Sequence, residues 1–233
     1  MQTNVVSDNV NIEHIVPFYQ PIFNLDTGAA VRYECLARLL DEHQKIHLPN
    51  EFLYLVERTE FTAAMTQRML DMSTAFFKPK QMRWSVNMFE ADLSDMRIVD
   101  DMAKLCQHVD RGLCGIELPY RNVKNNLSAL RKFMEQIPKL HITVDDVDEC
   151  DAKLHALIAS GVDAVKLKGS VVREFASTGS TKKTIECVQH YCKEYSVNLI
   201  AEHIEDQQTL EAVKSMEIKY GQGFYLSKPH TTV

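Results

Sequence analysis

Carboxylate and amide side chains, with one lysine, stand at or near the ends of short apolar runs in this chain. The most prominent feature is the adjacent pair Asp145 and Asp146, which follows the apolar start of HITVDDVDEC. Two neighbouring carboxylates at the end of a buried run repel each other unless something offsets their charge. The remaining members of this set are Glu34, Asn87, Glu117, Lys166, Glu202 and Gln222.

The ligand atoms of this set are hard oxygens, and no His or Cys belongs to it. Such oxygens favour Mg²⁺ or Mn²⁺ over Zn²⁺. Adjacent Asp side chains suit two ions, because one carboxylate can bridge while its neighbour binds the second ion. Two ions a few Å apart can assist in-line attack of water on a phosphodiester. The sequence therefore predicts a site for two divalent cations.

A simpler interpretation exists for each residue taken alone. A single Glu or Asn at a strand end is usually a loop hydrogen-bonder or a helix cap. Asp145 and Glu202 could equally be ion-pair partners of Lys166. The recurrence of polar residues at the same end of successive runs favours a shared site, but residue spacing by itself leaves the two interpretations evenly balanced.

Eight apolar or β-branched runs are typical of strands, and helical periodicity lies between most of them. The expected strands are 15–22, 30–36, 83–88, 114–118, 141–145, 163–167, 197–201 and 219–226. The expected helices are 49–59, 61–77, 93–108, 123–137, 149–160, 180–195 and 206–216, with Asn50, Ser94 and Asp206 as N-cap candidates.

Alternation of strands and helices predicts parallel β/α units, and eight strands predict a closed barrel. The turn residues Asp26, Thr27 and Gly28 separate the first two strands, so these two are expected to form an antiparallel hairpin. The fold class is therefore α/β, a modified TIM (β/α)8 barrel with an antiparallel first strand. An open doubly wound sheet is the alternative. No linker divides the chain, so residues 1–233 are read as one domain with a core of about 15–230.

Composition narrows the choice of function. Hydrophobic residues make up 45% and charged residues 25% of the chain, which is typical of a globular protein. The net charge of −6 disfavours binding to a nucleic acid polymer, although a small phosphodiester could bind beside local cations.

The sequence also indicates the location of the protein. No signal peptide and no apolar run of about 18 residues occur, so we expect a cytoplasmic protein without membrane insertion. The six scattered cysteines are expected to be reduced thiols.

Several spaced motifs resemble the EAL-domain family of cyclic di-GMP phosphodiesterases and receptors. FYQPIFNLDTGAAVRYECLARL at 18–39 is similar to the opening segment of that family, with Glu34-Cys35-Leu36 in place of its name-giving tripeptide. Further similarities are WSVNM at 84–88, GIELP at 115–119, VDD at 144–146, DAVK at 163–166, IAEHIE at 200–205 and GQGFYLSKP at 221–229. The resemblance implies the same modified barrel with an antiparallel first hairpin.

The resemblance also implies roles for individual residues. The metal ligands would be Glu34, Asn87, Glu117, Asp145 and Asp146, holding Mg²⁺ or Mn²⁺. Lys166 and Glu202 would position or deprotonate the attacking water, Gln222 would help to hold that water, and Glu205 would support the site from its loop. Gln20, Leu36 and Arg38 would contact the dinucleotide, with the planar donor fork of Arg38 facing a phosphate.

Some positions depart from the family pattern. The glycine-rich loop DDFGTGYSSL is replaced by DDVDECDAKL at 145–154, and Tyr120 replaces a loop-steadying Glu. His203 stands where the family has Gly. These changes put the second ion and a loop-linked homodimer in question. The leading hypothesis is hydrolysis of cyclic di-GMP to linear pGpG. The alternatives are a weak or inactive cyclic di-GMP receptor and a module that binds a regulatory protein partner.

Overall fold

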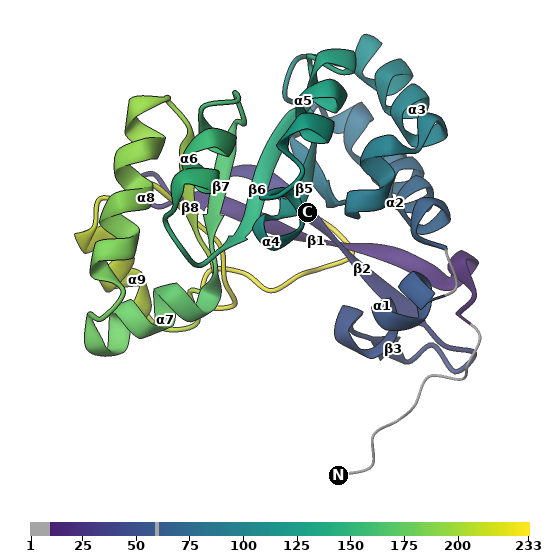
Figure 1. Ribbon diagram of the computed structural model, residues 1–233. Helices are drawn as coiled ribbons and strands as arrows, with labels where there is room; N and C mark the ends of the chain where they lie inside the picture. Colours follow the sequence, from purple (N-terminus) through teal and green to yellow (C-terminus); the bar gives the residue numbers. More distant parts are fainter. Residues whose placement is uncertain (1–9, 59–60) are drawn as a thin grey trace.

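A β-barrel surrounded by helices carries the candidate residues in this computed structural model, which describes residues 10–58 and 61–233 (Figure 1). The β-branched and apolar runs form its strands, because such side chains pack well on a pleated surface. The described strands are β1 (Ile15–Asn24), β2 (Ala30–Leu40), β3 (Ile46–His47), β4 (Trp84–Asn87), β5 (Cys114–Pro119), β6 (His141–Val147), β7 (Ala164–Leu167), β8 (Asn198–Ala201) and β9 (Tyr220–Gly221).

The order of the strands confirms the predicted closed barrel and excludes the open doubly wound sheet. The sheet runs β1-β9-β8-β7-β6-β5-β4-β2, and the pairing of β1 with β2 closes it, while the short β3 extends from β2. Strand β1 is antiparallel to both of its neighbours, β2 and β9. The neighbouring strands from β2 through β4 to β9 pair in parallel. Closure therefore directs the carboxyl ends of these parallel strands toward one mouth.

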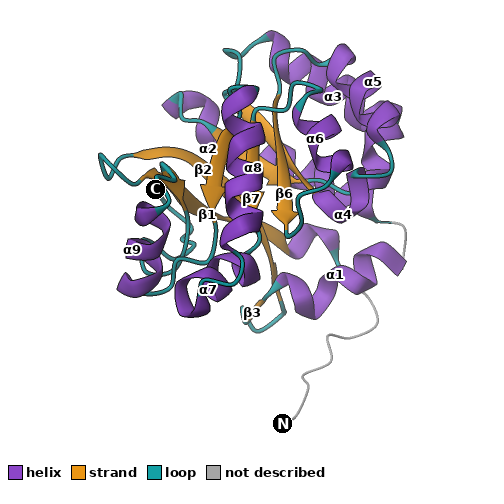
Figure 2. Ribbon diagram, turned by 60° about the vertical axis from the view of Figure 1, so that its left-hand side comes forward, coloured by secondary structure: helices purple, strands orange, loops and turns teal. Residues whose placement is uncertain are grey.

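Helices pack on the outside of the barrel, as two views of the molecule show (Figures 1 and 2). The described α-helices are α1 (Pro49–Arg58), α2 (Thr62–Phe77), α3 (Met96–Gln107), α4 (Tyr120–Val123), α5 (Leu127–Gln136), α6 (Ala152–Ile158), α7 (Gly169–Thr178), α8 (Lys182–Glu194) and α9 (Gln207–Ser215). Short 3-10 turns cover Ile12–His14, Lys78–Lys80 and Glu90–Ser94. None of the described helices is long and apolar enough to cross a bilayer.

Several predicted boundaries were wrong for local reasons. Asn50 lies inside α1 and does not cap it, and Ser94 ends a 3-10 turn. The Asp95 side chain, which accepts a hydrogen bond from the Arg97 backbone N–H, caps α3 instead. Asp206 is confirmed as the N-cap of α9, because its carboxylate accepts the Thr209 backbone N–H at 2.7 Å.

Other differences concern the lengths of elements. The expected strand 219–226 is paired only at Tyr220–Gly221. The helix expected at 123–137 corresponds to α5 and overlaps the short α4 only at Val123, and α7 was missed. The helix expected at 149–160 begins only at Ala152, because the Asp151 carboxylate caps the backbone N–H groups of Lys153 and Leu154. That late start leaves residues 148–151 as a loop between the end of β6 at Val147 and α6.

The prediction of six reduced cysteines was also wrong. Cys150 and Cys187 are joined as a disulfide between the loop before α6 and helix α8. Their Cα atoms lie 6.2 Å apart, within the range that a disulfide can span. The two cysteines are 37 residues apart in sequence, so no CxxC motif predicted this disulfide. The remaining cysteines, Cys35, Cys106, Cys114 and Cys192, are free and buried.

Candidate active site

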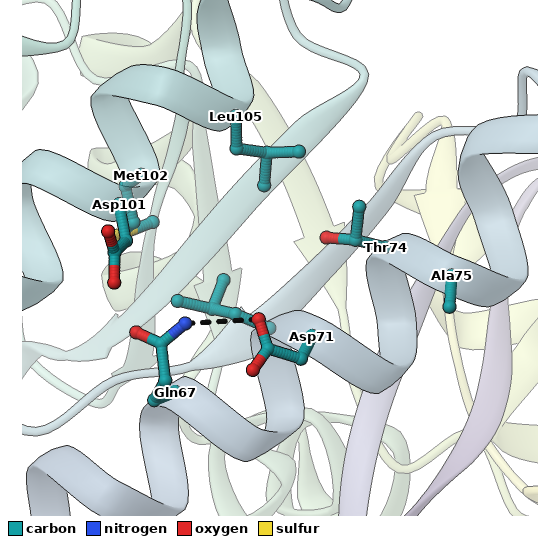
Figure 3. A pocket seen from close by; sticks show the side chains of 8 residues that line it. Gln67, Asp71, Thr74, Ala75, Asp101, Met102 and Leu105 are labelled. Carbon is teal, nitrogen blue, oxygen red and sulfur yellow. Dashed lines mark hydrogen bonds between the residues drawn. The ribbon is translucent and has the colours of Figure 1, made fainter.

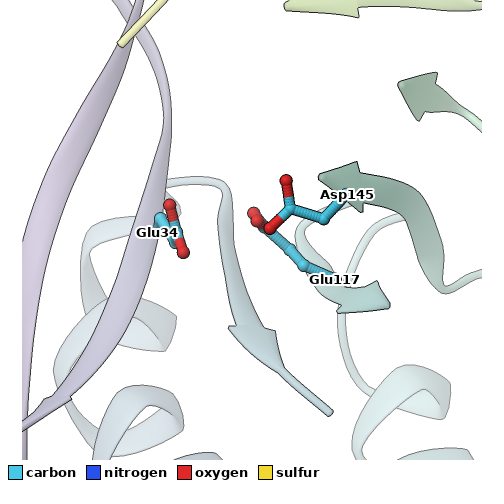
Figure 4. A group of neighbouring side chains, drawn as sticks. All are labelled: Glu34, Glu117 and Asp145. Carbon is cyan, nitrogen blue, oxygen red and sulfur yellow. The ribbon is translucent and has the colours of Figure 1, made fainter. Parts of the chain in front are cut away.

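Strand register brings the predicted residues to the mouth of the barrel. Asn87 at the end of β4 is paired with Glu117 on β5, and Asp145 on β6 is paired with Pro119, two residues further along β5. Glu34 approaches from β2 on the other side of the site, and its carboxylate faces those of Glu117 and Asp145 (Figure 4). Four strands that are remote in sequence thus contribute to a single site.

The ammonium of Lys166 lies at the centre of a cluster of four carboxylates. Its Nζ atom is 2.7 Å from Oε2 of Glu117, 2.7 Å from Oε1 of Glu202, 3.0 Å from Oε2 of Glu34 and 3.6 Å from Oδ1 of Asp145. The Lys166 side chain is fully buried. One positive charge facing four acidic groups leaves the cluster with excess negative charge whenever all four are ionised.

The carboxylate of Glu34 is held by amide donors as well as by Lys166. The Nδ2 of Asn87 donates to Oε1 of Glu34 at 2.8 Å, and the Nε2 of Gln222 donates to Oε2 at 2.7 Å. The same Nε2 also donates to Oε1 of Gln20 at 2.9 Å. The Oε1 of Gln222 is buried and has no hydrogen-bond partner. This oxygen could therefore accept a hydrogen bond from a ligand or water in the site.

Burial and mutual repulsion shift the pKa values of the acidic groups. Burial, with a contribution from the Glu34 carboxylate, raises the pKa of Glu117 to about 7. Burial also raises the pKa of Glu202 to about 7, although the Lys166 ammonium opposes that shift. Burial, followed by repulsion from Glu202, raises the pKa of Asp145 well above its ordinary value. These groups thus gain protons more readily than ordinary surface carboxylates.

Two groups in the cluster are shifted toward their charged forms. Burial opposes ionisation of Glu34, but the Lys166 ammonium and the Asn87 amide together hold the pKa of this carboxyl below its usual value. Burial likewise opposes the charged form of Lys166, and the surrounding carboxylates overcome it, so the pKa of the ammonium is raised well above normal. Lys166 therefore stays protonated throughout the neutral pH range.

The donor set fits a hard divalent cation. Oxygen atoms of Glu34, Glu117 and Asp145 all lie within 4.8 Å of one another. Ligand oxygens about 2.1 Å from an ion are at most about 4.2 Å apart, so small side-chain movements would let all three oxygens contact one ion. Asn87 adds a neutral amide at the same mouth. The oxygen chemistry and close approach of these groups agree with the predicted Mg²⁺ or Mn²⁺ and offer nothing that would select Zn²⁺.

Asp146 is not among the described carboxylates that gather within 4.8 Å of one another. Its backbone adopts a left-handed conformation with φ of 56°, and its N–H donates to Oδ1 of Asp145 at 2.7 Å. His203, next to Glu202, is also left-handed with φ of 55°. Glu205 lies exposed in the same loop. The structure thus brings together four of the predicted ligands, Glu34, Asn87, Glu117 and Asp145. The predicted ligand Asp146 and the predicted loop support Glu205 lie outside that cluster.

The predicted dinucleotide-contacting residues share one face of the β1–β2 hairpin. Gln20 is paired with Glu34, and Leu36 and Arg38 follow at alternate positions of β2. The Nε2 of Gln20 donates to the backbone oxygen of Ser227 at 2.9 Å. The Arg38 guanidinium is 5.5 Å from the centre of the Phe18 ring, and its Nη1 donates to the Ala37 carbonyl. Its other N–H groups are therefore available to a phosphate near the mouth.

Ser85 is a member of the site that the sequence analysis missed. Its Oγ donates to Oε1 of Glu117 at 2.5 Å, and its side chain is fully buried. Ser85 lies two residues before Asn87 on β4, and residues two apart in a strand face the same side. That alternation was the available signal.

A hollow of about 480 Å³ on the outside of the barrel does not belong to this site (Figure 3). It lies between α2 and α3, where Gln67 donates a hydrogen bond to Asp71. Its lining consists of helix residues, and the strand-end residues described above do not contribute to it.

Comparison with known protein families identifies one model over almost the whole chain. The EAL domain family model matches residues 3–229. A similar curated relative is the probable cyclic di-GMP phosphodiesterase PdeG of Escherichia coli (strain K12), which is 23% identical over 235 residues. The match covers 96% of this chain and 46% of PdeG, so the chain spans about half the length of that relative.

Solved structures share the fold at low sequence identity. The PaMucR phosphodiesterase in complex with c-di-GMP is 18% identical, with a TM-score of 0.83 over 94% of this chain and 92% of that one. The FimX EAL domain from Pseudomonas aeruginosa, bound to c-di-GMP, is 17% identical, with a TM-score of 0.83 over 94% and 91% of the two chains. Both comparisons agree with the modified barrel observed here.

Proposed function

The chain belongs to the EAL domain family, and we propose that it is a phosphodiesterase that hydrolyses cyclic di-GMP to linear pGpG. The observation that carries this proposal is the cluster of four carboxylates around Lys166 at the mouth of the barrel. Such an excess of buried acidic groups is suited to a divalent cation and to the negative phosphate it would bring. Relatives named as cyclic di-GMP phosphodiesterases support the choice of substrate.

Mg²⁺ or Mn²⁺ bound by Glu34, Asn87, Glu117 and Asp145, with a second ion involving Asp146, would neutralise phosphate charge and make water a stronger nucleophile. All of these ligands are oxygen atoms, as such ions require.

Glu202 is the proposed general base. Its pKa of about 7 lets the carboxylate accept a proton near neutral pH, since catalytic groups work best when their pKa lies near the working pH. Lys166 contacts Glu202 at 2.7 Å and keeps it oriented toward the other carboxylates. In the proposed step, water bonds to phosphorus while the phosphorus bond to the 3′ oxygen breaks. Glu202 takes one proton from water, and the leaving 3′ oxygen takes a proton from a solvent water molecule.

The hairpin residues are proposed to hold the dinucleotide over the cluster. Arg38 can donate to a phosphate through its free N–H groups, and Leu36 offers apolar contact beside it. Gln20 and Gln222 are hydrogen-bonded to each other beside Glu34, so their positions are fixed before substrate arrives. Glu205 is proposed to support the neighbouring loop.

The test is an assay of purified protein with cyclic di-GMP and Mg²⁺ or Mn²⁺, followed by chromatography of the products. We expect pGpG to form and Glu34→Gln to reduce its rate at least about a hundredfold, because the substitution removes a charged ligand without changing side-chain size. Glu211→Gln is the matched control, since Glu211 is exposed on α9, where its carboxylate accepts a hydrogen bond from Gln207. Absence of pGpG with every cation would contradict the proposal.

A receptor that binds cyclic di-GMP without cleaving it is the second candidate. It is favoured by one observation, the position of Asp146 outside the carboxylates that gather at the mouth. Binding measured with Ca²⁺, in the absence of turnover with Mg²⁺ or Mn²⁺, would support this candidate over the enzyme.

A further inference from the structure

The loop of residues 148–151 is held on every side by other elements. Asp148 pairs with Lys168 at 2.7 Å, and Glu149 pairs with Lys124 at 2.6 Å. The hydroxyl of Tyr120 donates to the Asp151 carboxylate. Cys150 completes the set through its disulfide to Cys187. These partners lie at helices α4, α7 and α8, so each residue of the loop is linked to another part of the fold.

The disulfide is the only covalent contact among these four. The side chains of Asp148, Glu149, Lys124 and Lys168 are all 29% or more exposed, and such surface ion pairs contribute little to stability. The disulfide instead ties the loop to α8, which is anchored in the core by buried residues including Ile185 and Val188. The disulfide is also the one contact among these four that thiol–disulfide exchange could open.

The two bonded sulfurs belong to residues that solvent can reach. Cys150 and Cys187 are partly exposed, in contrast to the four free cysteines, which are buried. A small thiol or disulfide reagent should therefore react with this pair before it reacts with the others.

The loop is continuous with the acidic end of the site. Asp146 lies four residues before Cys150 and adopts a left-handed backbone, a conformation that non-glycine residues keep only when their surroundings impose it. The pairing of β6 with β7 is irregular between Val144 and Val147, on either side of the Asp pair. The anchoring of residues 148–151 therefore bears directly on where the Asp146 carboxylate can lie.

We propose that Cys150 and Cys187 form a reversible disulfide that sets the affinity of the Asp145 and Asp146 end of the site for a divalent cation. The oxidised form holds the loop in one arrangement, so the loop loses less conformational entropy when the cation binds. Reduction releases Cys150 and weakens cation binding. The coupling to a cation rests on the proposed function, whereas the redox reaction of the two thiols does not.

The redox step is thiol–disulfide exchange with a small organic disulfide such as oxidised glutathione. One protein thiolate attacks a sulfur of the reagent, forming a mixed disulfide and releasing one glutathione thiolate. The second protein thiolate then attacks the protein sulfur of that intermediate and releases the other glutathione. Two protein thiols are oxidised, one organic disulfide is reduced to two thiols, and the two protons pass to solvent or to the released thiolates.

The experiment compares the full chain after treatment with oxidised or reduced glutathione, removed by anaerobic gel filtration. Peptide mapping after alkylation identifies the linked cysteines, electron paramagnetic resonance of free Mn²⁺ gives its dissociation constant, and hydrogen exchange reports on residues 146–151. We expect a Cys150–Cys187 link, at least about fivefold tighter Mn²⁺ binding in the oxidised form, and slower exchange in that segment.

Two variants separate the role of the disulfide from that of a general cysteine substitution. Cys187→Ser should bind Mn²⁺ like the reduced protein under both treatments. Cys192→Ser, on the same helix, should respond like the unchanged protein.

Three results would overturn the proposal. They are failure of oxidised glutathione to link Cys150 with Cys187, equal Mn²⁺ affinity in the two forms, and equal hydrogen exchange of residues 146–151. If neither form binds Mn²⁺, the proposed metal-dependent function fails and the coupling to a cation fails with it. The exchange rates then still decide whether the disulfide orders the loop.

Discussion

The Nζ atom of Lys166 lies 3.0 Å from Oε2 of Glu34, although the two residues are 132 positions apart in sequence. The contact joins β7 to β2 across the mouth of the barrel. It places the ammonium that forms an ion pair with Glu34 in the middle of the acidic cluster. Lys166 is therefore the cation that lies close to all four carboxylates of the cluster.

Replacing that lysine is expected to destabilise the cation-free protein. Lys166→Met keeps the apolar stem but leaves the buried carboxylates without a counter-charge. The free energy of unfolding should fall by about 3–5 kcal/mol, as when one partner of a buried ion pair is removed. Urea unfolding with a chelator present measures the change, and saturating Mn²⁺ should recover part of it.

Lys182→Met is the matched control for this change. Lys182 forms an exposed i,i+4 pair with Glu186 on α8, and such pairs contribute only a few tenths of a kcal/mol. If Lys166→Met altered stability no more than Lys182→Met does, the buried cluster would not depend on the ammonium.

Stability of the cation-free protein should fall as pH rises from about 5 to 7. The pKa of Glu202 is raised from 4.5 to about 7, so within this window the folded protein keeps a proton that the unfolded chain has released. Stability is therefore highest below the unfolded pKa and is lost as pH approaches 7, by about 1–3 kcal/mol. Urea unfolding across the range, with a chelator present, measures the slope.

Two comparisons make this pH prediction specific. Glu202→Gln should flatten part of the slope, because the amide does not titrate. Saturating Mn²⁺ should flatten it as well, since a bound cation favours the ionised carboxylates. A slope that is unchanged by both would show that other groups cause it.

Sequence reasoning located the barrel because its signals are local. Turn residues 26–28 and the alternation of strands with helices were sufficient to predict the hairpin and the closed sheet, and both are confirmed. Boundaries were less predictable, because they depend on single capping contacts. Asp95, for example, caps α3 in place of the expected Ser94, and nothing in the local pattern separates two adjacent capping residues.

The sequence was sufficient to predict which residues gather at the barrel mouth where a polar residue stands at the end of a predicted strand. Glu34, Glu117, Asp145 and Lys166 meet because strand ends of a barrel converge. The partners of the divergent loop were not predictable. Cys150 and Cys187 come together only because the loop before α6 packs beside α8, a tertiary relationship that sequence spacing does not encode.

Ser85 offers a test of a residue that only the structure placed in the site. Ser85→Ala removes the hydroxyl donor 2.5 Å from Oε1 of Glu117 and should lower stability by about 1–3 kcal/mol. It should also weaken Mn²⁺ binding severalfold, because Glu117 loses a contact that orients it. Thermal unfolding and Mn²⁺ titration measure the two effects.

Thr66→Val is the matched control for Ser85→Ala. The Thr66 hydroxyl donates to the Asp92 carboxylate at 2.6 Å in a buried pair outside the barrel mouth. Its loss should reduce stability to a similar degree without altering Mn²⁺ affinity. Equal loss of affinity in both variants would indicate a general effect of unfolding and would contradict the role given to Ser85.

The backbone at His203 should be strained, and substitution can measure the strain. His203 adopts φ of 55°, a left-handed conformation that costs a residue with a Cβ atom about 1–2 kcal/mol. His203→Gly and His203→Ala both remove the ring, but only glycine removes the strain. The glycine variant should therefore be more stable than the alanine variant by about 1 kcal/mol in urea unfolding. Ser196, also left-handed but remote from the carboxylate cluster, provides the same pair of substitutions as a control.

The ring of His203 should also restrict position 169 to glycine. A Cβ atom built on Gly169 would lie 2.3 Å from the His203 ring, so Gly169→Ala should destabilise the protein or displace the ring. In the His203→Gly background the same change should be tolerated, because the ring that it meets is gone. A double-mutant cycle would then give a coupling free energy of at least about 0.5 kcal/mol between the two positions. Strictly additive effects would show that the close approach does not constrain the loop that carries Glu202.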